Sequence, residues 1–264
     1  MKDLAIGVFD SGLGGLTVVR EIIAQLPSEE IVYFGDTARY PYGTKSPETV
    51  RRYALEDSRL LLGYGIKALV VACNTVSAVG MDLLADHLYL PSVGVVGPGA
   101  RAAVKATRNG RIGVIGTNAT ISSGIYERQL HELKKGVHVV SRPAPLFVSL
   151  VEEGSTSGKV AELIAEEYLA EIREAGIDTL VLGCTHYPLL KDTISKVMGP
   201  GVTLVDSAEE VSRDVARMLE EKDLVRSKPS PPSHRFIVSD DPERLKRTAA
   251  ILLGFEPSQA ELSI

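Results

Sequence analysis

Cysteine is scarce in this chain: only Cys73 and Cys184 occur in 264 residues. A disulfide framework of the kind that staples small secreted domains is therefore excluded, and each cysteine needs its own explanation. No apolar run reaches the length of a membrane-spanning helix, and the N-terminus lacks the basic and apolar regions of a signal peptide. We therefore expect a cytoplasmic protein without a membrane partner.

The chain also lacks a basic stripe. Lys and Arg number 29 against 34 Asp and Glu, for a formal net charge of −5, and the two signs are interspersed. Nucleic acid is therefore not an expected partner. Hydrophobic residues make up 44% and charged residues 24%, a composition typical of globular enzymes and sufficient for two modest cores.

Apolar runs alternate with amphipathic helical stretches along most of the chain, which predicts an α/β fold with mostly parallel sheets flanked by helices. Ser46 and Pro47 predict the start of a helix that runs to about Tyr64. Gly-Pro-Gly at 97–99 is interpreted as a break where the chain crosses to a second domain. The proline-rich segment 227–233 is expected to be an exposed connector.

The two halves of the chain resemble each other. Residues 65–75 read GIKALVVACNT and residues 176–186 read GIDTLVLGCTH, and Ile-Gly-Val occurs at both 6–8 and 112–114. One such match could arise by chance, because buried strands all draw on Val, Ile and Leu. Two matches in the same order indicate a duplicated α/β unit. The two cysteines would then lie at equivalent C-terminal strand ends, where open α/β sheets bind ligands.

The surroundings of the cysteines favour a catalytic role, with an inert place in the core as the alternative. Each follows an apolar strand and precedes small polar residues that can hold a carboxylate together with backbone N–H groups: Asn74, Thr75 and Thr185. Two thiols facing one carbon suit the removal of a proton from one face of a stereocentre and its replacement on the other. An ordinary thiol pKa of about 8.5 lets one of them be thiolate while the other stays protonated.

Two further side chains are candidates for proton transfer with the thiols. Asp10 ends the first predicted strand and is assigned to Cys73, with a turn or helix-capping role as an equal alternative. His186 lies two residues after Cys184 and is assigned to that thiol. Glu152 belongs to an acidic pair that the local pattern assigns to a solvated helix end.

Two loops are candidates for holding a substrate carboxylate. The run Asp10-Ser-Gly-Leu-Gly-Gly15 lacks the spacing and the Gly-Lys-Ser/Thr ending of nucleotide-binding loops, so we expect its N–H groups to approach a carboxylate. Tyr42 and Gly43 are expected to add a contact through backbone and hydroxyl, with a plain turn as the alternative. Cys and His do not cluster with zinc spacing and no lysine suits a pyridoxal Schiff base, so neither metal nor cofactor is expected.

A series of motifs resembles the aspartate/glutamate racemase superfamily and, within it, the glutamate racemases. The motifs are FDSGLGGLTV at 9–18, GDTARYPYG at 35–43, VACNTVSA at 71–78, TISSGIY at 120–126, PLFVSLVEEG at 145–154 and LGCTHYPLL at 182–190. The resemblance implies two pseudo-symmetric α/β domains, each a mostly parallel sheet flanked by helices, with the active site between them. We expect the first domain to comprise residues 1–96 and 208–264, and the second 97–207.

The resemblance also implies a function and roles for single residues. The implied function is interconversion of L- and D-glutamate without a cofactor, by two-base proton transfer between Cys73 and Cys184, to supply D-glutamate for bacterial peptidoglycan. The implied substrate contacts are Asp10, Ser11, Tyr42, Gly43, Asn74, Thr75, Thr185 and His186, with Glu152 as a secondary acid near the second thiol. The family is generally dimeric, so a homodimer is expected. Racemisation of aspartate or another acidic amino acid, and ligand binding without catalysis, are the alternatives.

Overall fold

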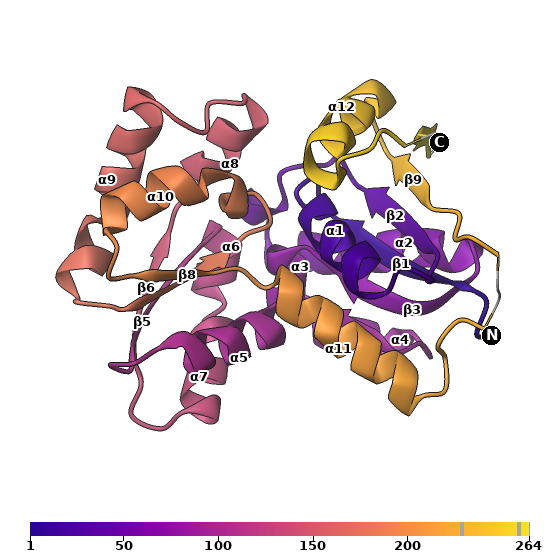
Figure 1. The fold of residues 1–264 in the computed structure, drawn as a ribbon, viewed down its shortest axis with the longest axis horizontal. Coiled ribbons are helices and arrows are strands. Elements are labelled where there is room, and N and C mark those ends of the chain that lie inside the picture. Colours follow the sequence, from indigo (N-terminus) through magenta and orange to yellow (C-terminus); the bar gives the residue numbers. More distant parts are fainter. Residues whose placement is uncertain (228–229, 258–259, 264) are drawn as a thin grey trace. The chain divides into compact units, whose positions relative to one another are not determined.

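The computed structural model describes residues 1–227, 230–257 and 260–263. The chain divides into two compact units, Met1–Val95 with Ala208–Ile264, and Val96–Ser207 (Figure 1). All strand pairings among the described residues are parallel. The predicted α/β class, with parallel sheets flanked by helices, is therefore confirmed.

The first unit, within its described residues, forms a six-stranded sheet in the order β10-β9-β2-β1-β3-β4. Its strands are β1 (Ala5–Asp10), β2 (Ile31–Gly35), β3 (Ile66–Val71), β4 (Ser92–Gly94), β9 (Arg235–Val238) and β10 (Ala260–Leu262). Its helices are α1 (Leu16–Gln25), the 3-10 helix η1 (Tyr42–Thr44), α2 (Pro47–Gly63), α3 (Asn74–Val79), α4 (Met81–His87), α11 (Ala208–Glu221) and α12 (Pro242–Leu253).

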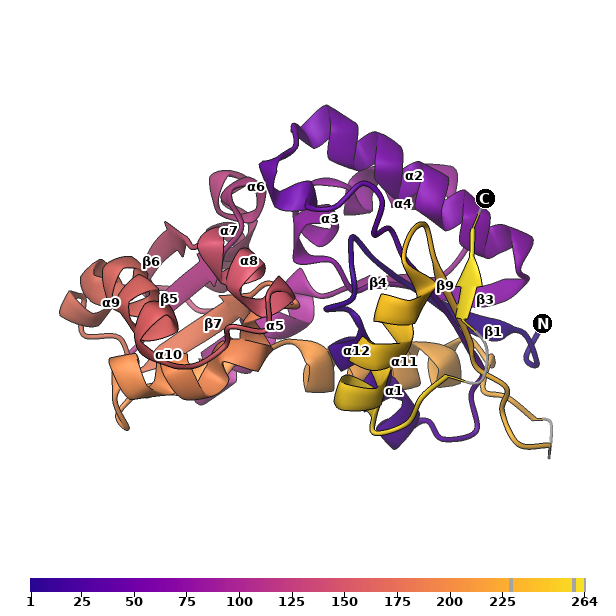
Figure 2. The ribbon, with the colours of Figure 1, turned by 90° about the horizontal axis from the view of Figure 1, so that it is seen from above.

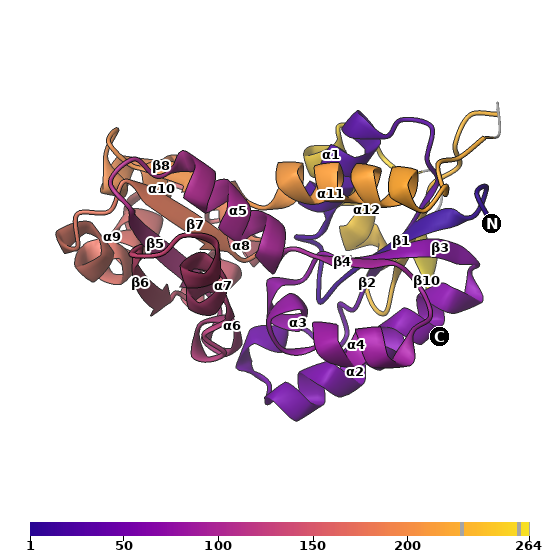
Figure 3. The same cartoon turned by 90° about the horizontal axis from the view of Figure 1, so that it is seen from below.

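Helices cover both faces of this sheet. Helix α1 packs against α11 and α12 on one face, and α2 packs against α3 and α4 on the other (Figure 2, Figure 3). Every residue of β1, β2 and β3 is buried as a result. This explains why these strands read as continuous apolar runs rather than as alternating ones.

The second unit, whose residues are all described, forms a four-stranded sheet in the order β6-β5-β7-β8. Its strands are β5 (Arg111–Gly116), β6 (His138–Pro143), β7 (Thr179–Gly183) and β8 (Thr203–Val205). Its helices are α5 (Val96–Ala106), α6 (Asn118–Ser122), α7 (Ile125–Leu133), α8 (Leu146–Glu152), α9 (Lys159–Glu174), the 3-10 helix η2 (Tyr187–Leu190) and α10 (Lys191–Met198). Helix α5 packs against α7, and α9 packs against α10.

Both units repeat one topology. The order β2-β1-β3-β4 in the first sheet corresponds to β6-β5-β7-β8 in the second. A Cβ at Gly7 would lie 2.6 Å from Ile66 Cδ1, and a Cβ at Gly113 would lie 2.7 Å from Ile177 Cδ1. In each unit, the glycine of the repeated Ile-Gly-Val therefore lies in close contact with the isoleucine of the repeated Gly-Ile. A duplicated unit predicts this shared contact.

The interpretation of Gly-Pro-Gly at 97–99 as a break is wrong in its local structure, although the two compact units divide just before it, between Val95 and Val96. The segment lies in the first turn of α5, which begins at Val96. Pro98 is tolerated there because the first N–H groups of a helix have no partner within the helix. The glycines and the proline do mark a structural boundary, but this boundary is the start of a helix rather than a loop.

The expected connector at 227–233 is only partly covered, since Lys228 and Pro229 lie outside the described residues. Ser230, Pro231 and Ser233 are exposed. None of the helices in the described part of the chain combines the length and apolar character needed to cross a membrane.

Candidate active site

The first cysteine follows β3, next to the loop that leaves β1. The backbone N–H of Ala72 donates to the carbonyl of Phe9 at 2.9 Å, which holds the two strand ends side by side. Cys73 comes next, is 4% exposed, and forms the N-cap of α3. Its Sγ lies 3.5 Å from Ser11 Oγ. The thiol and the Ser11 hydroxyl therefore meet at the C-terminal edge of the first sheet, where parallel sheets bind ligands.

Asp10 is the last residue of β1 and is completely buried. Its Oδ2 accepts a hydrogen bond from the Gly15 N–H at 2.9 Å. A Cβ at Gly15 would lie 2.6 Å from Asp10 Cβ and 3.1 Å from Ala72 Cβ, so only glycine lets the loop come this close. Because Gly15 is the N-cap of α1, this hydrogen bond ties the start of that helix to the end of β1. The role of Asp10 in proton transfer with Cys73 stays a prediction.

Tyr33 joins this group although no sequence pattern singles it out. The ring is completely buried, and its hydroxyl donates to the Gly12 carbonyl at 2.7 Å. Burial raises the pKa of Tyr33 well above its ordinary value, and the negative charges of Asp10 and Cys73 raise it further. Tyr33 is thus a neutral phenol, and its hydrogen bond to Gly12 holds it against the loop that follows Asp10. Its place within the apolar run of β2 made it indistinguishable from a core aromatic.

Two polar residues expected to hold a substrate carboxylate occupy the first turn of α3. Asn74 and Thr75 follow the thiol directly, and both are buried. Ser77, further along α3, donates to the Val71 carbonyl at 3.1 Å and accepts from the Val95 N–H at 3.0 Å. These bonds tie the short helix to the end of β3. The structure therefore brings Asn74 and Thr75 to the same sheet edge as Cys73.

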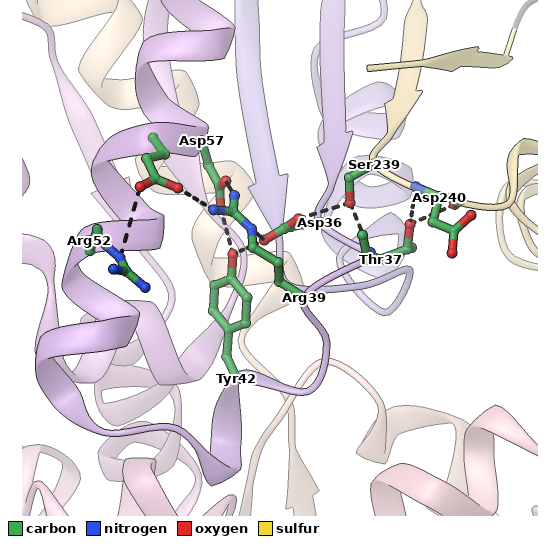
Figure 4. Close-up of polar contacts among 10 residues, drawn as sticks. Asp36, Thr37, Arg39, Tyr42, Arg52, Asp57, Ser239 and Asp240 are labelled. Atoms are coloured by element: carbon green, nitrogen blue, oxygen red, sulfur yellow. Dashed lines mark hydrogen bonds and ion pairs between the residues drawn. The ribbon is translucent and has the colours of Figure 1, made fainter. Parts of the chain in front are cut away.

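Tyr42 lies in η1, close to the end of β2, with its hydroxyl between two buried carboxyl groups (Figure 4). The hydroxyl donates to Asp36 and lies 2.9 Å from Asp57 Oδ2. The hydroxyl is therefore held within the protein, and the expected contact with a substrate carboxylate falls to the backbone of Tyr42 and Gly43. Gly43 is buried beside it.

The second cysteine follows β7 and is 7% exposed. Cys184 Sγ lies 3.7 Å from His186 Nδ1, and Thr185 Oγ1 lies 3.5 Å from the same nitrogen. On its other side, His186 Nε2 lies 2.6 Å from Glu152 Oε1. The buried imidazole therefore lies directly between the thiol and a carboxyl group. Glu152 is therefore not the solvated helix-end charge that the local pattern suggests.

Aromatic packing places Glu152 beside His186. Glu152 ends α8, and His186 is the N-cap of η2. Phe147 of α8 packs edge-on against Tyr187 of η2 with ring centroids 5.4 Å apart. The Tyr187 hydroxyl also donates to the carbonyl of Ala144, just before α8, at 2.8 Å. A contact between residues 34 positions apart thus depends on a packed interface that local sequence patterns do not reveal.

Tyr126 is a second buried phenol, which the sequence presents only as part of a motif. Burial raises the pKa of Tyr126, and the negative charge of Cys184 raises it further. A Cβ at Gly183 would lie 3.2 Å from the Tyr126 ring. Each thiol therefore has a buried, neutral tyrosine near it: Tyr33 for Cys73 and Tyr126 for Cys184.

Within residues 1–227, 230–257 and 260–263, no three His, Cys, Asp or Glu side chains form a group that could hold a metal ion.

The fold and these two strand ends agree with a known protein family. The sequence profile of the family described as Asp/Glu/Hydantoin racemase matches residues 6–214. The chain therefore belongs to this family and is an isomerase, a racemase. The resemblance carried by the sequence motifs is confirmed.

The chain is also similar to individual proteins that are glutamate racemases. The glutamate racemase of Geobacter metallireducens is 54% identical over 250 residues, which cover 95% of this chain and 93% of the relative. The crystal structure of a glutamate racemase isoform from Bacillus anthracis is 41% identical, with a TM-score of 0.94 over 100% of this chain and 98% of that one. The glutamate racemase of Francisella tularensis, solved in complex with D-glutamate, is 38% identical, with a TM-score of 0.92 and the same coverage.

Proposed function

We propose that this protein is a glutamate racemase that interconverts L- and D-glutamate through Cys73 and Cys184, without a cofactor. The observation that carries the proposal is the equivalence of the two thiols. Each is buried and lies just beyond the C-terminal end of the corresponding strand, β3 or β7, of a repeated α/β unit. The identity of 54% to a glutamate racemase, and the D-glutamate bound to a relative of 38% identity, support glutamate as the substrate.

The proposed reaction inverts the configuration of the α-carbon of glutamate. One cysteine, as thiolate, removes the α-proton from one face of the amino acid, and the electron pair of the broken C–H bond stays on the α-carbon and its carboxylate. The other cysteine, as thiol, delivers its proton to the opposite face. The product is the mirror image of the substrate, and thiol and thiolate have exchanged places between the two residues. Turnover in the opposite direction restores them.

The α-proton of an amino acid is a weak acid, so the thiolate needs help from the site. Hydrogen-bond donors aimed at the substrate carboxylate stabilise the negative charge that develops there. Asn74, Thr75 and Thr185 are buried beside the thiols and are the proposed donors, together with Ser11 and the backbone at Gly43. Burial of these groups strengthens each interaction, because little water competes.

The groups beside each thiol are proposed to move protons during turnover. Asp10 is assigned to Cys73, and His186 is assigned to Cys184. Glu152, at 2.6 Å from His186 Nε2, is proposed to orient the imidazole and to stabilise its protonated form. Asp10 and His186 are also proposed to contact the substrate.

Racemisation is tested directly with purified protein and each glutamate enantiomer, followed by circular dichroism without added cofactor. We expect both enantiomers to reach the same racemic end point. In D₂O, the product should acquire deuterium much faster than the remaining substrate, since the proton removed by one thiol is not the one returned by the other. Rapid deuterium entry into unconverted substrate contradicts the two-base scheme. Turnover of aspartate in place of glutamate points to the alternative substrate.

We further propose that the protein acts in the cytoplasm as a homodimer and supplies D-glutamate for peptidoglycan. Multi-angle light scattering of the purified protein measures the oligomeric state. Depletion in the source cell should produce a growth defect that added D-glutamate relieves, and relief by D-aspartate alone contradicts this role.

A further inference from the structure

A buried polar network surrounds the Tyr42 hydroxyl (Figure 4). Asp36 lies directly after β2, Asp57 lies on α2, and both side chains are almost fully buried. The Tyr42 hydroxyl contacts Oδ2 of each carboxyl group. Arg39 binds both as well, through Nε to Asp36 at 2.6 Å and through Nη2 to Asp57 at 2.7 Å. One phenol and one guanidinium thus bridge the same two carboxyl groups.

The protons in this network can be counted. A phenol has one proton to donate, so it can satisfy one of two carboxylates. If both carboxyl groups were ionised and the phenol donated to Asp36, no proton would lie between the phenol oxygen and Asp57 Oδ2. These two oxygens, 2.9 Å apart, would then repel each other. Two buried anions beside one cation would also leave an uncompensated charge, which is costly in a protein interior. A second proton, held by one carboxyl group, removes both conflicts.

The contacts decide which carboxyl group holds that proton. Asp36 accepts from Arg39 and Tyr42, and its Oδ1 accepts from Ser239 Oγ at 2.8 Å. Asp57 accepts from Arg39 through Oδ1, which leaves Oδ2 to face Tyr42. The ionised form is therefore better stabilised at Asp36. Burial raises the pKa of Asp57 well above its ordinary value of 3.8, and the charge of Asp36 raises it further.

We propose that Asp57 is a positioning residue for substrate binding: its protonated carboxyl group donates to Tyr42, Tyr42 donates to Asp36, and this chain fixes the Tyr42–Gly43 turn. The proposal rests on the proposed function, in which that turn contacts the substrate. The Asp36 N–H also donates to the Asp10 carbonyl at 3.0 Å. The network therefore connects helix α2 to the turn and to the strand end that carries Asp10.

Other charged groups around Asp57 are compatible with this assignment. Arg39 stacks over the Tyr53 ring, with its guanidinium carbon 4.2 Å from the ring centroid. Glu56, on the same helix, pairs with Arg39 but has a side chain that is 46% exposed, so water screens its charge. The titratable and charged groups that face Asp57 are Asp36, Arg39 and Tyr42 from the loop after β2, and Glu56 from α2 itself.

Three variants of full-length protein test the proposal through the KM for each glutamate enantiomer. Asp57→Asn keeps a donor for Tyr42 and an acceptor for Arg39, so KM should stay within about 3-fold of wild type. Asp57→Leu removes both, and KM should rise about 10-fold or more, with kcat changing less, as for loss of a positioned contact. Glu56→Gln removes a different carboxylate from Arg39 and should leave KM unchanged.

The outcomes separate positioning from stability alone. If Asp57→Leu folds and binds glutamate with the wild-type KM, Asp57 does not position the turn. If Asp57→Asn is as harmful as Asp57→Leu, the carboxyl group is ionised and the proton assignment is wrong.

A second measurement keeps the proton assignment testable without glutamate. In the unfolded chain Asp57 ionises near its ordinary pKa of 3.8, whereas the folded protein keeps the proton to higher pH. Wild-type stability should therefore fall as pH rises above that value, relative to Asp57→Asn, which has no such proton. Urea unfolding at pH 5 and pH 8 should show the stability of Asp57→Asn rising relative to wild type. A pH-independent difference overturns the assignment, and wild-type protein that never racemises glutamate refutes the proposed function instead.

Discussion

The two thiol sites occupy equivalent places in a repeated fold and yet have different neighbours. Cys73 lies 3.5 Å from a serine hydroxyl, at the strand end where Asp10 is held by a backbone N–H of a glycine-rich loop. Cys184 lies 3.7 Å from an imidazole, which in turn lies 2.6 Å from Glu152. Strand order and the Gly-Ile contact are shared, whereas the polar groups come from different elements: the end of β1 and its loop for Cys73, and the segment after β7 with the end of α8 for Cys184.

This difference shows which parts of a duplicated unit are constrained. A thiol at the C-terminal end of the corresponding strand is placed by the sheet itself, so duplication reproduces it. The groups that we propose to exchange protons with each thiol are supplied by local loops and helices, and a carboxylate or an imidazole can serve. A pair of chemically unequal bases also suits two substrates that are mirror images rather than identical molecules.

The largest expected effect is the loss of activity when either cysteine is replaced. It tests whether both thiols are needed for the reaction. Cys73→Ala and Cys184→Ala should each lower kcat/KM by about 10²–10⁴, the range for a positioned acid-base group. The double variant should be little worse than either single one, because both act in one reaction. Initial rates of circular dichroism change, measured from both enantiomers, check this. A single variant that keeps a large share of wild-type activity contradicts the two-thiol mechanism.

The next prediction distinguishes Asp10, which is proposed to exchange protons with a thiol directly, from Glu152, which is proposed to act through His186. Asp10→Asn should lower kcat by about 10²-fold, as expected for a group that exchanges protons with a thiol. Glu152→Gln should lower it only about 10-fold, because Glu152 acts through His186. Rates measured in both directions check the order. A larger loss in Glu152→Gln than in Asp10→Asn contradicts the proposed roles of these two carboxyl groups.

Buried carboxyl groups of the two units should respond to pH in opposite senses. Burial alone would raise the pKa of Asp178 in the second unit, but hydrogen bonds from the side chains of Thr107 and Thr179 and the N–H groups of Arg108 and Asn109 lower it overall. This carboxylate therefore stabilises the fold above its ordinary pKa of 3.8, and the benefit is lost as pH falls through the folded value.

Asp178→Asn tests this contrast with Asp57 of the first unit. At pH 7 the substitution should destabilise the protein by about 2 kcal/mol, the scale of hydrogen bonds to a charged group. The cost should shrink toward pH 3, whereas the relative stability of Asp57→Asn should rise with increasing pH. Urea unfolding across this range measures both, and a cost for Asp178→Asn that grows in acid contradicts the expectation.

The last prediction tests the close contact that the two units share. Gly7→Ala and Gly113→Ala should each destabilise the fold by about 1–3 kcal/mol, because the new methyl group overlaps an isoleucine in the same way. Gly63→Ala is the matched control, since a Cβ there meets no atom within 4 Å and alanine favours a helix. Urea midpoints should show similar losses for the first two and none for the control. Unequal losses indicate that the repeated contact is not equivalent.

Several elements could be predicted from local sequence because local chemistry forms them. Ser46 accepts a hydrogen bond from the Thr49 N–H, and Pro47 begins α2, which ends at Gly63. The helix predicted to run to about Tyr64 is therefore confirmed. Gly-Pro-Gly at 97–99 misled because the same residues suit a loop and a first helical turn, and the choice between them depends on the rest of the helix.

The candidate site also contains residues that the local sequence predicts and residues that it does not. The two cysteines and their polar neighbours could be selected because a strand followed by a thiol and small polar residues is a local pattern. Tyr33 and Asp57 were missed, since a tyrosine in an apolar strand and an aspartate in a long helix carry no local signal. Both contact residues that lie elsewhere in the chain: Tyr33 contacts Gly12, and Asp57 contacts Tyr42.

The sequence by itself determined the α/β class, the duplication and the positions of both thiols at strand ends, because periodicity and adjacency along the chain encode these features. Only the tertiary structure decided that Glu152 meets His186, and that one phenol lies between two buried carboxyl groups. These contacts depend on how helices pack on a sheet. Packing is set by many side chains at once, and no single motif records it.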